Sequence, residues 1–301
     1  MIRLDRFLVA SGQARTRSQA KTWIDAGRVR VDGKQRKAGF EVGGGERIEI
    51  DPPSEPGGAP LGEDLPLTIL YEDDHLLAID KPAGMVVHPA PGWSRGTVVN
   101  ALLYRRLVSS LPDDERPGIV HRLDKETSGV LLIARNAAAH ERLARAFHDR
   151  LVKKTYSAIV LGRPRRPAAT IDWSIGRHAS ERKRMSIHGP RAREARTHFV
   201  VRETFRSLSL LRVTPETGRT HQIRVHLAAL GHPVLGDAVY GSRRGRALPR
   251  QGPGSDFARH ALHAAEIEFR HPASGEAMHL EAPLPRDMSD LLAELRSADD
   301  S

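Results

Sequence analysis

The chain has 301 residues and a formal net charge of +10, which favour two domains and a polyanionic partner such as nucleic acid, although a generic basic surface would carry the same charge. It contains no cysteine, which excludes a disulfide scaffold, a thiolate nucleophile and a cysteine-ligated zinc site. No apolar stretch approaches the ~20 residues that span a bilayer, and residues 1–8 lack the layout of a signal peptide, so we expect a cytoplasmic protein.

The first 50 residues predict a small, basic α/β module. Apolar residues recur at helical spacing over residues 4–8 and 20–24, and residues 29–31 and 47–50 alternate as strands do. The module holds eleven Lys or Arg against six Asp or Glu, so it carries about half of the net charge. These cations either contact phosphates or form a solvated surface. The candidate phosphate contacts are Arg15, Arg17, Lys21 and Arg28.

A linker is predicted at residues 51–66, where five prolines and three glycines occupy sixteen positions. We therefore predict a domain of residues 1–50, this linker, and a larger domain of residues 67–301. A stretch rich in Arg, Pro and Gly at residues 242–256 is interpreted as a surface insertion.

Strands and helices mix without strict alternation in the larger domain. Residues 67–71 and 75–79 are strand-like runs separated by acidic residues, which favours a hairpin. Residues 97–103 and 137–147 have helical spacing, and Asn136 is the expected N-cap of the second helix. This pattern predicts an α+β fold on a mixed, largely antiparallel sheet rather than a doubly wound one.

One carboxylate stands out because of its neighbours. Asp124 lies between Arg122 and Lys125, just before the apolar strand predicted at residues 130–134. The two cations should lower the pKa of Asp124, and a loop that enters a rigid strand is a common place for catalytic groups. Asp124 is therefore a candidate nucleophile or base, and a solvated surface ion pair is the alternative.

A second polar residue lies on a predicted helix at residues 220–231. Thr220 is the expected N-cap, Gly231 the expected stop, and apolar residues recur at i, i+4 and i+7. Arg224 lies beside this apolar stripe, where a guanidinium can pair with a carboxylate in a pocket. The alternative is an arginine that extends from an amphipathic helix into solvent.

Several long segments, in one order, resemble the RluA-type pseudouridine synthases. His121-Arg122-Leu123-Asp124, followed by Thr127-Ser128-Gly129-Val130, resembles the signature of that family, and Lys154-Thr155-Tyr156 resembles its Lys-x-Tyr segment. Residues 217–226 resemble its second long motif. Matching segments at residues 231–237 and 262–264 follow, and residues 1–50 resemble the small RNA-binding domain named after ribosomal protein S-four.

The resemblance implies that uridines in RNA are isomerised to pseudouridine. The base must be unstacked, released from the sugar, rotated and rejoined through carbon 5, which requires neither a metal nor a cofactor. The resemblance assigns Asp124 as the essential carboxylate, Arg224 as its salt-bridge partner and Tyr156 as the active-site tyrosine. Whether Asp124 attacks the sugar, attacks the base or removes a proton from the sugar stays open.

Further residues of these motifs are candidate RNA contacts. The resemblance implies that Arg122 fills or supports the gap that the flipped nucleotide leaves. We expect His121 and Lys125 to contact phosphates or the loop itself. The remaining candidates for RNA binding are Arg219, His221 and Gln222.

The order of the two domains resembles most the synthases that act on large-subunit ribosomal RNA, of the RluC and RluD kind. Residues 191–195 depart from the pattern of those relatives, so a transfer RNA substrate stays open. We expect RNA as the partner, no association with membranes, and a monomer.

Parts of the sequence suggest three other functions. Residues 121–124 superficially resemble the catalytic loop of protein kinases, but the required spacing and the other kinase motifs are absent. His221 and His226 are five residues apart, whereas a metal-binding pair on a helix is usually separated by four. A non-catalytic RNA-binding protein remains the main competing hypothesis, and it predicts that Asp124 is dispensable.

Overall fold

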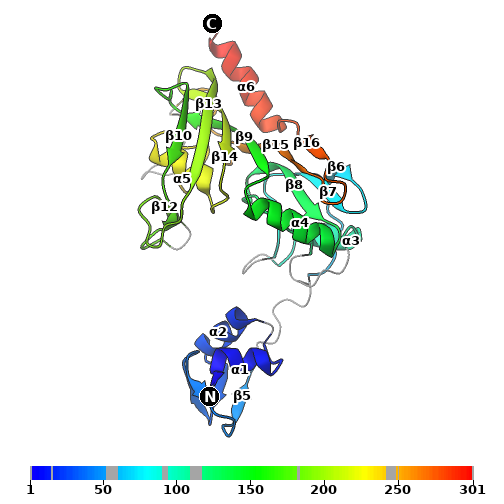
Figure 1. Ribbon diagram of the computed structural model, residues 1–301. Helices are drawn as coiled ribbons and strands as arrows, with labels where there is room; N and C mark the ends of the chain where they lie inside the picture. The colour runs from blue at the N-terminus through cyan, green and yellow to red at the C-terminus, as the bar shows by residue number, and fades with distance from the viewer. Residues whose placement is uncertain are drawn as a thin grey trace. The chain divides into compact units, whose positions relative to one another are not determined.

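The computed structural model describes residues 2–14, 16–51, 60–89, 94–108, 117–181, 184–241, 249 and 251–299, with the backbone alone for Ser18 and Asp299. The chain divides into two compact units, Met1–Gly58 and Ala59–Ser301 (Figure 1). Half of the predicted linker, at residues 52–59, and most of the predicted insertion, at residues 242–248 and 250, lie outside the described residues. No helix in the described part of the chain combines the length and apolar character that crossing a membrane requires.

The first unit is a small α/β module, as its sequence predicts. Leu4 and Leu8 of the first helix are fully buried and pack with Ala20 and Ile24 of the second helix. The hydroxyl of Thr16 accepts a hydrogen bond from the backbone of Gln19 and caps the second helix. Its elements are β1 (Ile2–Arg3), α1 (Leu4–Ala10), α2 (Arg17–Asp25), β2 (Val29–Val31), β3 (Lys34–Gln35), β4 (Glu41–Val42) and β5 (Ile48–Ile50).

The second unit is built on a nine-stranded sheet, in the order β10-β13-β14-β9-β15-β8-β7-β6, with β16 paired to β15. Among the described strands of this sheet, every pairing is antiparallel except that of β15 with β8, which confirms the predicted α+β class. The strands are β6 (Thr68–Glu72), β7 (Leu76–Lys81), β8 (Ser128–Ala134), β9 (Lys153–Leu161), β10 (Ala168–Asp172), β13 (Arg196–Thr204), β14 (Leu208–Pro215), β15 (Leu262–Arg270) and β16 (Ala277–Glu281); β11 (Gly176–Arg177) and β12 (Met185–Ser186) form a separate pair.

Helices cover both faces of β7 and β8. Val130 and Leu132 pack in one core cluster with α4 (Ala137–His148), while Leu131 and Ile133 pack in another with α3 (Val98–Tyr104). Both faces of β8 are therefore buried, which explains why residues 130–134 are apolar at every position. Figure 1 shows α4 lying along β8. The predicted cap of α4 is confirmed, since the Asn136 side chain accepts from the backbone of Ala139 at 2.9 Å.

Close packing fixes where β8 begins. Gly129 has a φ of +113°, and a Cβ at this position would lie 2.2 Å from the carbonyl oxygen of Ala264 on β15. Only glycine therefore allows β8 and β15 to approach here. The loop that carries Asp124 ends at this point, so its last residues are held against β15.

The helix at residues 220–231 differs from its prediction. It is α5 (Gln222–Ala229), and its N-cap is His221, at a left-handed φ of 55°, rather than Thr220. Its side chains from Gln222 to Leu227 are all buried, so there is no single apolar stripe. This burial is tolerated because the polar side chains of Gln222 and His226 have internal hydrogen-bond partners. The last helix, α6 (Arg286–Asp299), packs with α5 and β14 in the largest core cluster.

Candidate active site

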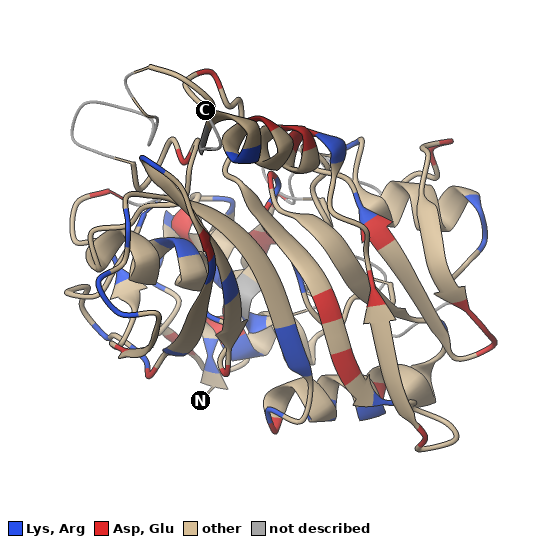
Figure 2. Ribbon diagram, turned by 90° about the horizontal axis from the view of Figure 1, so that it is seen from above, with Lys and Arg blue, Asp and Glu red and all other residues tan. Residues whose placement is uncertain are grey.

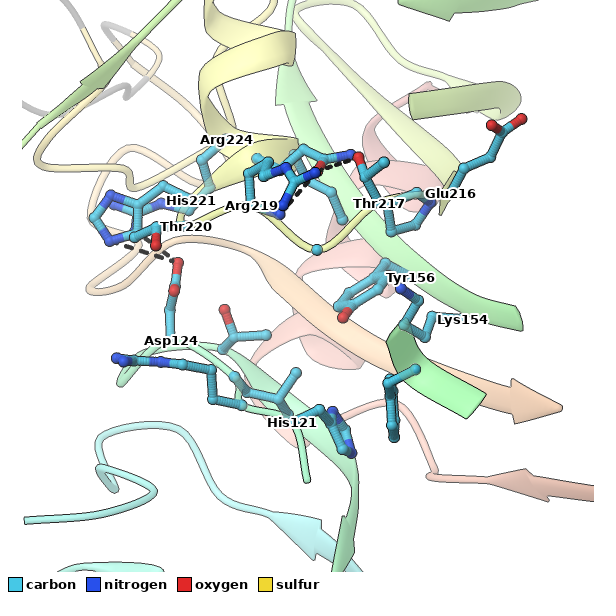
Figure 3. Close-up of a pocket in the computed structure, with 18 of the residues that line it drawn as sticks. His121, Asp124, Lys154, Tyr156, Glu216, Thr217, Arg219, Thr220, His221 and Arg224 are labelled. Carbon is cyan, nitrogen blue, oxygen red and sulfur yellow. Dashed lines mark hydrogen bonds and ion pairs between the residues drawn. The ribbon is translucent and has the colours of Figure 1, made fainter. Parts of the chain in front are cut away.

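A cavity of about 680 Å³ lies between the loop before β8 and the loop before α5 (Figure 3). Sites for small molecules are usually about 300–1,000 Å³ in volume, so the cavity can hold a nucleoside. The end of α4 and the start of β9 complete its walls. The predicted site residues that line it are His121, Arg122, Asp124, Tyr156, Arg219, His221, Gln222 and Arg224.

Arg224 joins two carboxylates at the floor of this cavity. Its Nη1 donates to Oδ2 of Asp124 at 2.9 Å, and its Nε and Nη2 donate to the two oxygens of Asp237 at 2.7 and 3.0 Å. The side chains of Arg224 and Asp237 are 6% and 0% exposed, whereas that of Asp124 is 21% exposed. Asp237 thus fixes the guanidinium, and Asp124 is the carboxylate that the cavity can reach.

The pKa of Asp124 is lowered from its ordinary value. Burial opposes its ionisation, but the charges of His221 and Arg224 outweigh burial. Burial lowers the pKa of His221 although the charge of Asp124 raises it, so Arg224 supplies the permanent positive charge beside Asp124. The largest effects that lower the pKa of Asp124 therefore come from the region of α5, rather than from its sequence neighbours Arg122 and Lys125.

Sequence reasoning missed the role of Asp237. Besides Arg224, its Oδ1 accepts from the backbone N–H groups of Val239 and Tyr240 at 2.8 and 2.9 Å. Burial opposes its charge, yet these donors and Arg224 lower the pKa of Asp237. The sequence offered one signal, because Asp237 ends the segment at residues 231–237 that resembles the family.

Lys81 supports the loop that carries Asp124. It is fully buried, and its Nζ donates to the carbonyl oxygens of Pro82, Met85 and Lys125 at 2.7, 2.9 and 3.1 Å. Burial lowers its pKa to about 7, although Glu126 and other acids favour its charge. Three carbonyl acceptors match the three protons of an ammonium group, so the geometry favours the charged form.

The other side of this loop is held by the segment just before β15 and by α6. Arg259 is buried, donates to the carbonyl oxygen of Glu126 at 3.1 Å, and pairs with both oxygens of Asp287 at 2.6 and 2.8 Å. Thr127 Oγ1 lies 2.7 Å from Nε2 of His260, whose pKa burial lowers to about 3. Asp124 therefore sits on a loop with fixed backbone contacts on both sides.

Tyr156 lies on β9 opposite Asp124 (Figure 3). Burial raises the pKa of its phenol, and the charge of Asp124 raises it further. The hydroxyl therefore stays protonated at neutral pH and can donate a hydrogen bond. Its ring forms part of the cavity wall, where an unstacked base could lie against it.

His121 is used partly for structure. Its Nε2 accepts from the backbone N–H of Leu132 at 2.8 Å, and its ring stacks on Phe147 with centroids 4.5 Å apart. Burial, with a contribution from Lys154, lowers its pKa from 6.5 to about 3. The neutral ring therefore carries its proton on Nδ1.

We expect the His121→Gln variant to lose less stability in acid than the wild type. The unfolded chain protonates His121 near pH 6.5, and the folded chain only near pH 3, so its contribution is complete above pH 6.5 and is lost as the pH falls toward 3. Gln keeps a carbonyl acceptor for Leu132 without titrating. Urea unfolding at pH 7 and pH 5 measures the difference, with exposed His188→Gln as the control. Equal losses in both variants would contradict the prediction.

The loop before α5 is organised by Gln222. Its Oε1 accepts from Thr217 Oγ1 at 2.7 Å and from the backbone of Arg219 at 3.0 Å, while its Nε2 donates to the carbonyl oxygen of Arg196 at 2.9 Å. Nδ1 of His221 lies 2.8 Å from the Tyr240 hydroxyl. These contacts hold the loop over the cavity.

The structure separates the other predicted RNA contacts. Arg122 is exposed at the cavity, whereas Lys125 lies outside its lining, 3.7 Å from a carboxylate oxygen of Glu126. In the first unit, Arg15 lies outside the described residues. The ion pairs of the remaining three are Arg17 with Asp5, Lys21 with Asp25, and Arg28 with Asp51.

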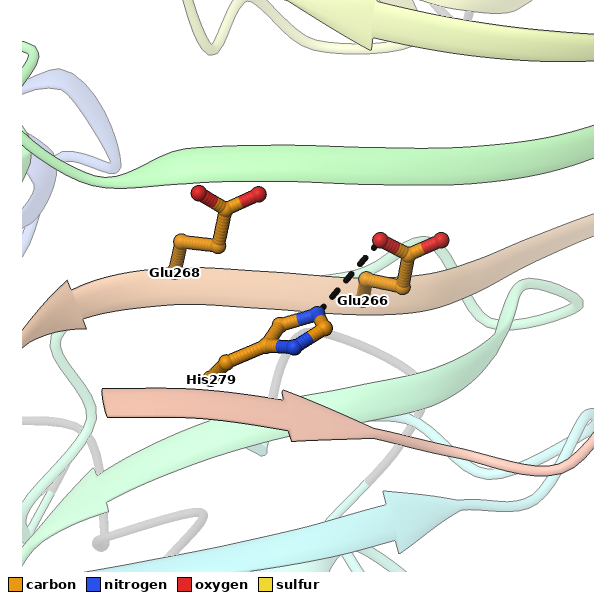
Figure 4. Close-up of side chains that lie close together, drawn as sticks. All are labelled: Glu266, Glu268 and His279. Carbon is orange, nitrogen blue, oxygen red and sulfur yellow. Dashed lines mark ion pairs between the residues drawn. The ribbon is translucent and has the colours of Figure 1, made fainter.

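A group of Glu266, Glu268 and His279 on β15 and β16 has the composition of a metal site (Figure 4). Each carboxylate already has a cation, Arg212 at 2.9 Å for Glu266 and Lys153 at 2.6 Å for Glu268. Figure 2 shows acidic and basic positions on neighbouring strands of the sheet. A metal ion would have to displace both cations, so we assign no site to this group.

Comparisons with known proteins agree with this geometry. The chain is 42% identical to the "Ribosomal large subunit pseudouridine synthase D" of Pseudomonas aeruginosa, over 98% of this chain and 92% of the relative. It is 40% identical to the "Uncharacterized RNA pseudouridine synthase YlyB" of Bacillus subtilis, over 98% and 94%. The solved human "RNA Pseudouridylate Synthase Domain Containing 4" has a TM-score of 0.60 at 29% identity, over 76% and 93%.

Profiles of known families match both parts of the chain. The S4 domain matches residues 2–48, which confirms the resemblance stated for the basic module. The RNA pseudouridylate synthase profile matches residues 75–229, a span that includes Asp124, Tyr156 and Arg224. The protein is therefore an isomerase that belongs to the RNA pseudouridylate synthase family.

Proposed function

We propose that this protein converts specific uridines of large-subunit ribosomal RNA to pseudouridine. The relative from Pseudomonas aeruginosa is named for that RNA, and it matches nearly the whole chain. The basic residues of the S4 domain suit a polyanion. In this proposal residues 1–50 bind RNA, residues 67–301 carry the chemistry, and the reaction takes place in the cytoplasm.

The observation that carries this proposal is the pairing of Asp124 with Arg224 in a cavity of nucleoside size. A target uridine turned out of its stack would place its sugar and base within reach of an ionised carboxylate. Asp124 then acts on the sugar or the base, while Arg224 keeps it charged and oriented. Tyr156 supports the base from the opposite wall.

The rim of the cavity suits the RNA backbone. Arg122, Arg150 and Arg193 are exposed there, and their guanidinium groups can bind phosphates. We propose that Arg122 in addition occupies the gap that the flipped nucleotide leaves in the RNA. Contacts at the rim can offset the few kcal/mol that unstacking a base costs.

Pseudouridine mapping tests the proposal. Total RNA from cells with and without the gene is compared at every uridine, and we expect one or a few large-subunit ribosomal positions to lose their modification. Restoring the wild-type gene should restore these positions, and the Asp124→Asn gene should not. A loss confined to transfer RNA would correct the substrate, and an unchanged map would refute the assignment.

A further inference from the structure

Lys154 is a half-buried cation that has no role in the proposed function so far. It lines the cavity and lies beside Tyr156 on β9 (Figure 3). Residues two positions apart on a strand point to the same face, so Lys154 and Tyr156 share the wall opposite Asp124. Its neighbour Lys153 points to the other face, where it pairs with Glu268.

The amine of Lys154 has no acid to balance its charge in the part of the chain that the structure describes. Among those residues it takes part in no ion pair and no hydrogen bond, whereas Lys153, Arg212 and Arg224 all have carboxylate partners. Burial lowers the pKa of Lys154, which expresses the cost of keeping this charge out of water. An ionisable group that lines a cavity and has a shifted pKa is a common feature of active sites.

We propose that Lys154 is a catalytic residue that stabilises the negative charge developing on the uracil base during the exchange of its glycosidic bond. The inference rests on the proposed function and adds a group to it. The exposed arginines of the rim are better placed for phosphates, because a phosphate remains at the surface when a base enters a pocket. Lys154 is less exposed than these arginines, and it lines the cavity beside Tyr156.

The balance of the reaction requires such a charge. When the bond between C1′ and N1 breaks, the base keeps the electron pair, and its negative charge is shared by N1 and the carbonyl oxygens. Attack of Asp124 on the base also places negative charge on a carbonyl oxygen. The bond from C1′ to C5 then forms, C5 loses its proton and N1 gains one, so no external reactant is consumed. A nearby ammonium lowers the energy of the charged stage in each of these routes.

The test compares Lys154→Met with Lys153→Met on a large-subunit ribosomal RNA transcript labelled with tritium at uracil C5. Release of the label in a single turnover at saturating enzyme reports the chemical step. We expect Lys154→Met to slow release about 10²–10³-fold, the usual effect of removing one group that stabilises transition-state charge. Lys153→Met should match the wild type, because Lys153 faces away from the cavity.

Stability separates this role from a structural one. Lys154 is half-buried and has no acidic partner among the described residues, so an apolar side chain should leave the unfolding temperature of Lys154→Met equal to or above that of the wild type. Lys154→Arg should recover part of the rate. As the pH rises, the rate of Lys154→Arg should begin to fall at a higher pH than the rate of the wild type. The reason is that a guanidinium stays charged at a pH where a half-buried lysine loses its proton.

Three outcomes would overturn the inference. A rate for Lys154→Met close to that of Lys153→Met removes Lys154 from the chemistry. A weaker RNA dissociation constant and a smaller salt dependence, with an unchanged single-turnover rate, would make Lys154 a phosphate contact. A lower unfolding temperature in both Lys154 variants would make it a structural residue. Wild-type enzyme inactive on the transcript would instead count against the proposed substrate, which is a separate result.

Discussion

Asp124→Asn is expected to abolish isomerisation while leaving the fold and the affinity for RNA nearly unchanged. The amide keeps an oxygen that can accept from Arg224 Nη1, so the 2.9 Å contact can persist, but it is neither a nucleophile nor a base. Loss of an essential nucleophile commonly costs at least about 10⁴-fold in turnover. Release of C5 tritium and a filter-binding titration measure the two quantities separately.

The control for this variant is Glu141→Gln, which removes an exposed carboxylate from α4 outside the cavity lining. It should retain wild-type turnover and stability. Full activity in Asp124→Asn would place the chemistry at another group. Lost RNA binding in Asp124→Asn would show that the carboxylate serves the complex rather than the reaction.

Arg224→Met is expected to lower the free energy of unfolding by about 3–5 kcal/mol and to abolish activity. The substitution leaves Asp237, which is completely buried, without its guanidinium partner, and it leaves Asp124 without its nearest cation. Without the charge of Arg224, the effect of burial on Asp124 would dominate, and the pKa of Asp124 would rise. Denaturant unfolding at pH 7, followed by turnover measurements on the folded fraction, tests both effects.

The double variant Arg224→Met with Asp237→Asn separates stability from catalysis. The asparagine oxygen can still accept from the backbone of Val239 and Tyr240, and no unpaired buried charge remains at this position. We expect it to recover most of the lost stability and none of the lost activity, because nothing orients Asp124. If the double variant were as unstable as the single one, the cost would come from packing rather than charge.

Much of the fold could be predicted from local patterns. The alternation at residues 29–31, the apolar run of β8 and the Asn136 cap depend on neighbours in the chain, so their sequences are sufficient to indicate them. The start of α5 could not be predicted in this way. Thr220 is a good capping residue, yet the hydrogen bonds of Gln222 with Thr217 and Arg196 hold the preceding loop in another conformation.

The candidate site likewise contains some residues that could be identified from the sequence and others that could not. Asp124, Tyr156 and Arg224 were identified through motifs, because catalytic residue types recur at fixed positions within a segment. Asp237 and Lys81 were not given roles, because their neighbours in the sequence do not show which distant residues they contact in the folded protein. Their importance comes from partners that are 13 and 44 residues away in the chain.

The amino-acid sequence by itself determined the family, the α+β class and the carboxylate around which the site is built. Only the tertiary structure decided which cation acts on that carboxylate. Arg122 and Lys125 are its neighbours in the chain, but Arg224, 100 residues later, donates to it in the folded protein. The reason is physical: the strength of an ion pair depends on separation in space and on exclusion of water, and folding sets both.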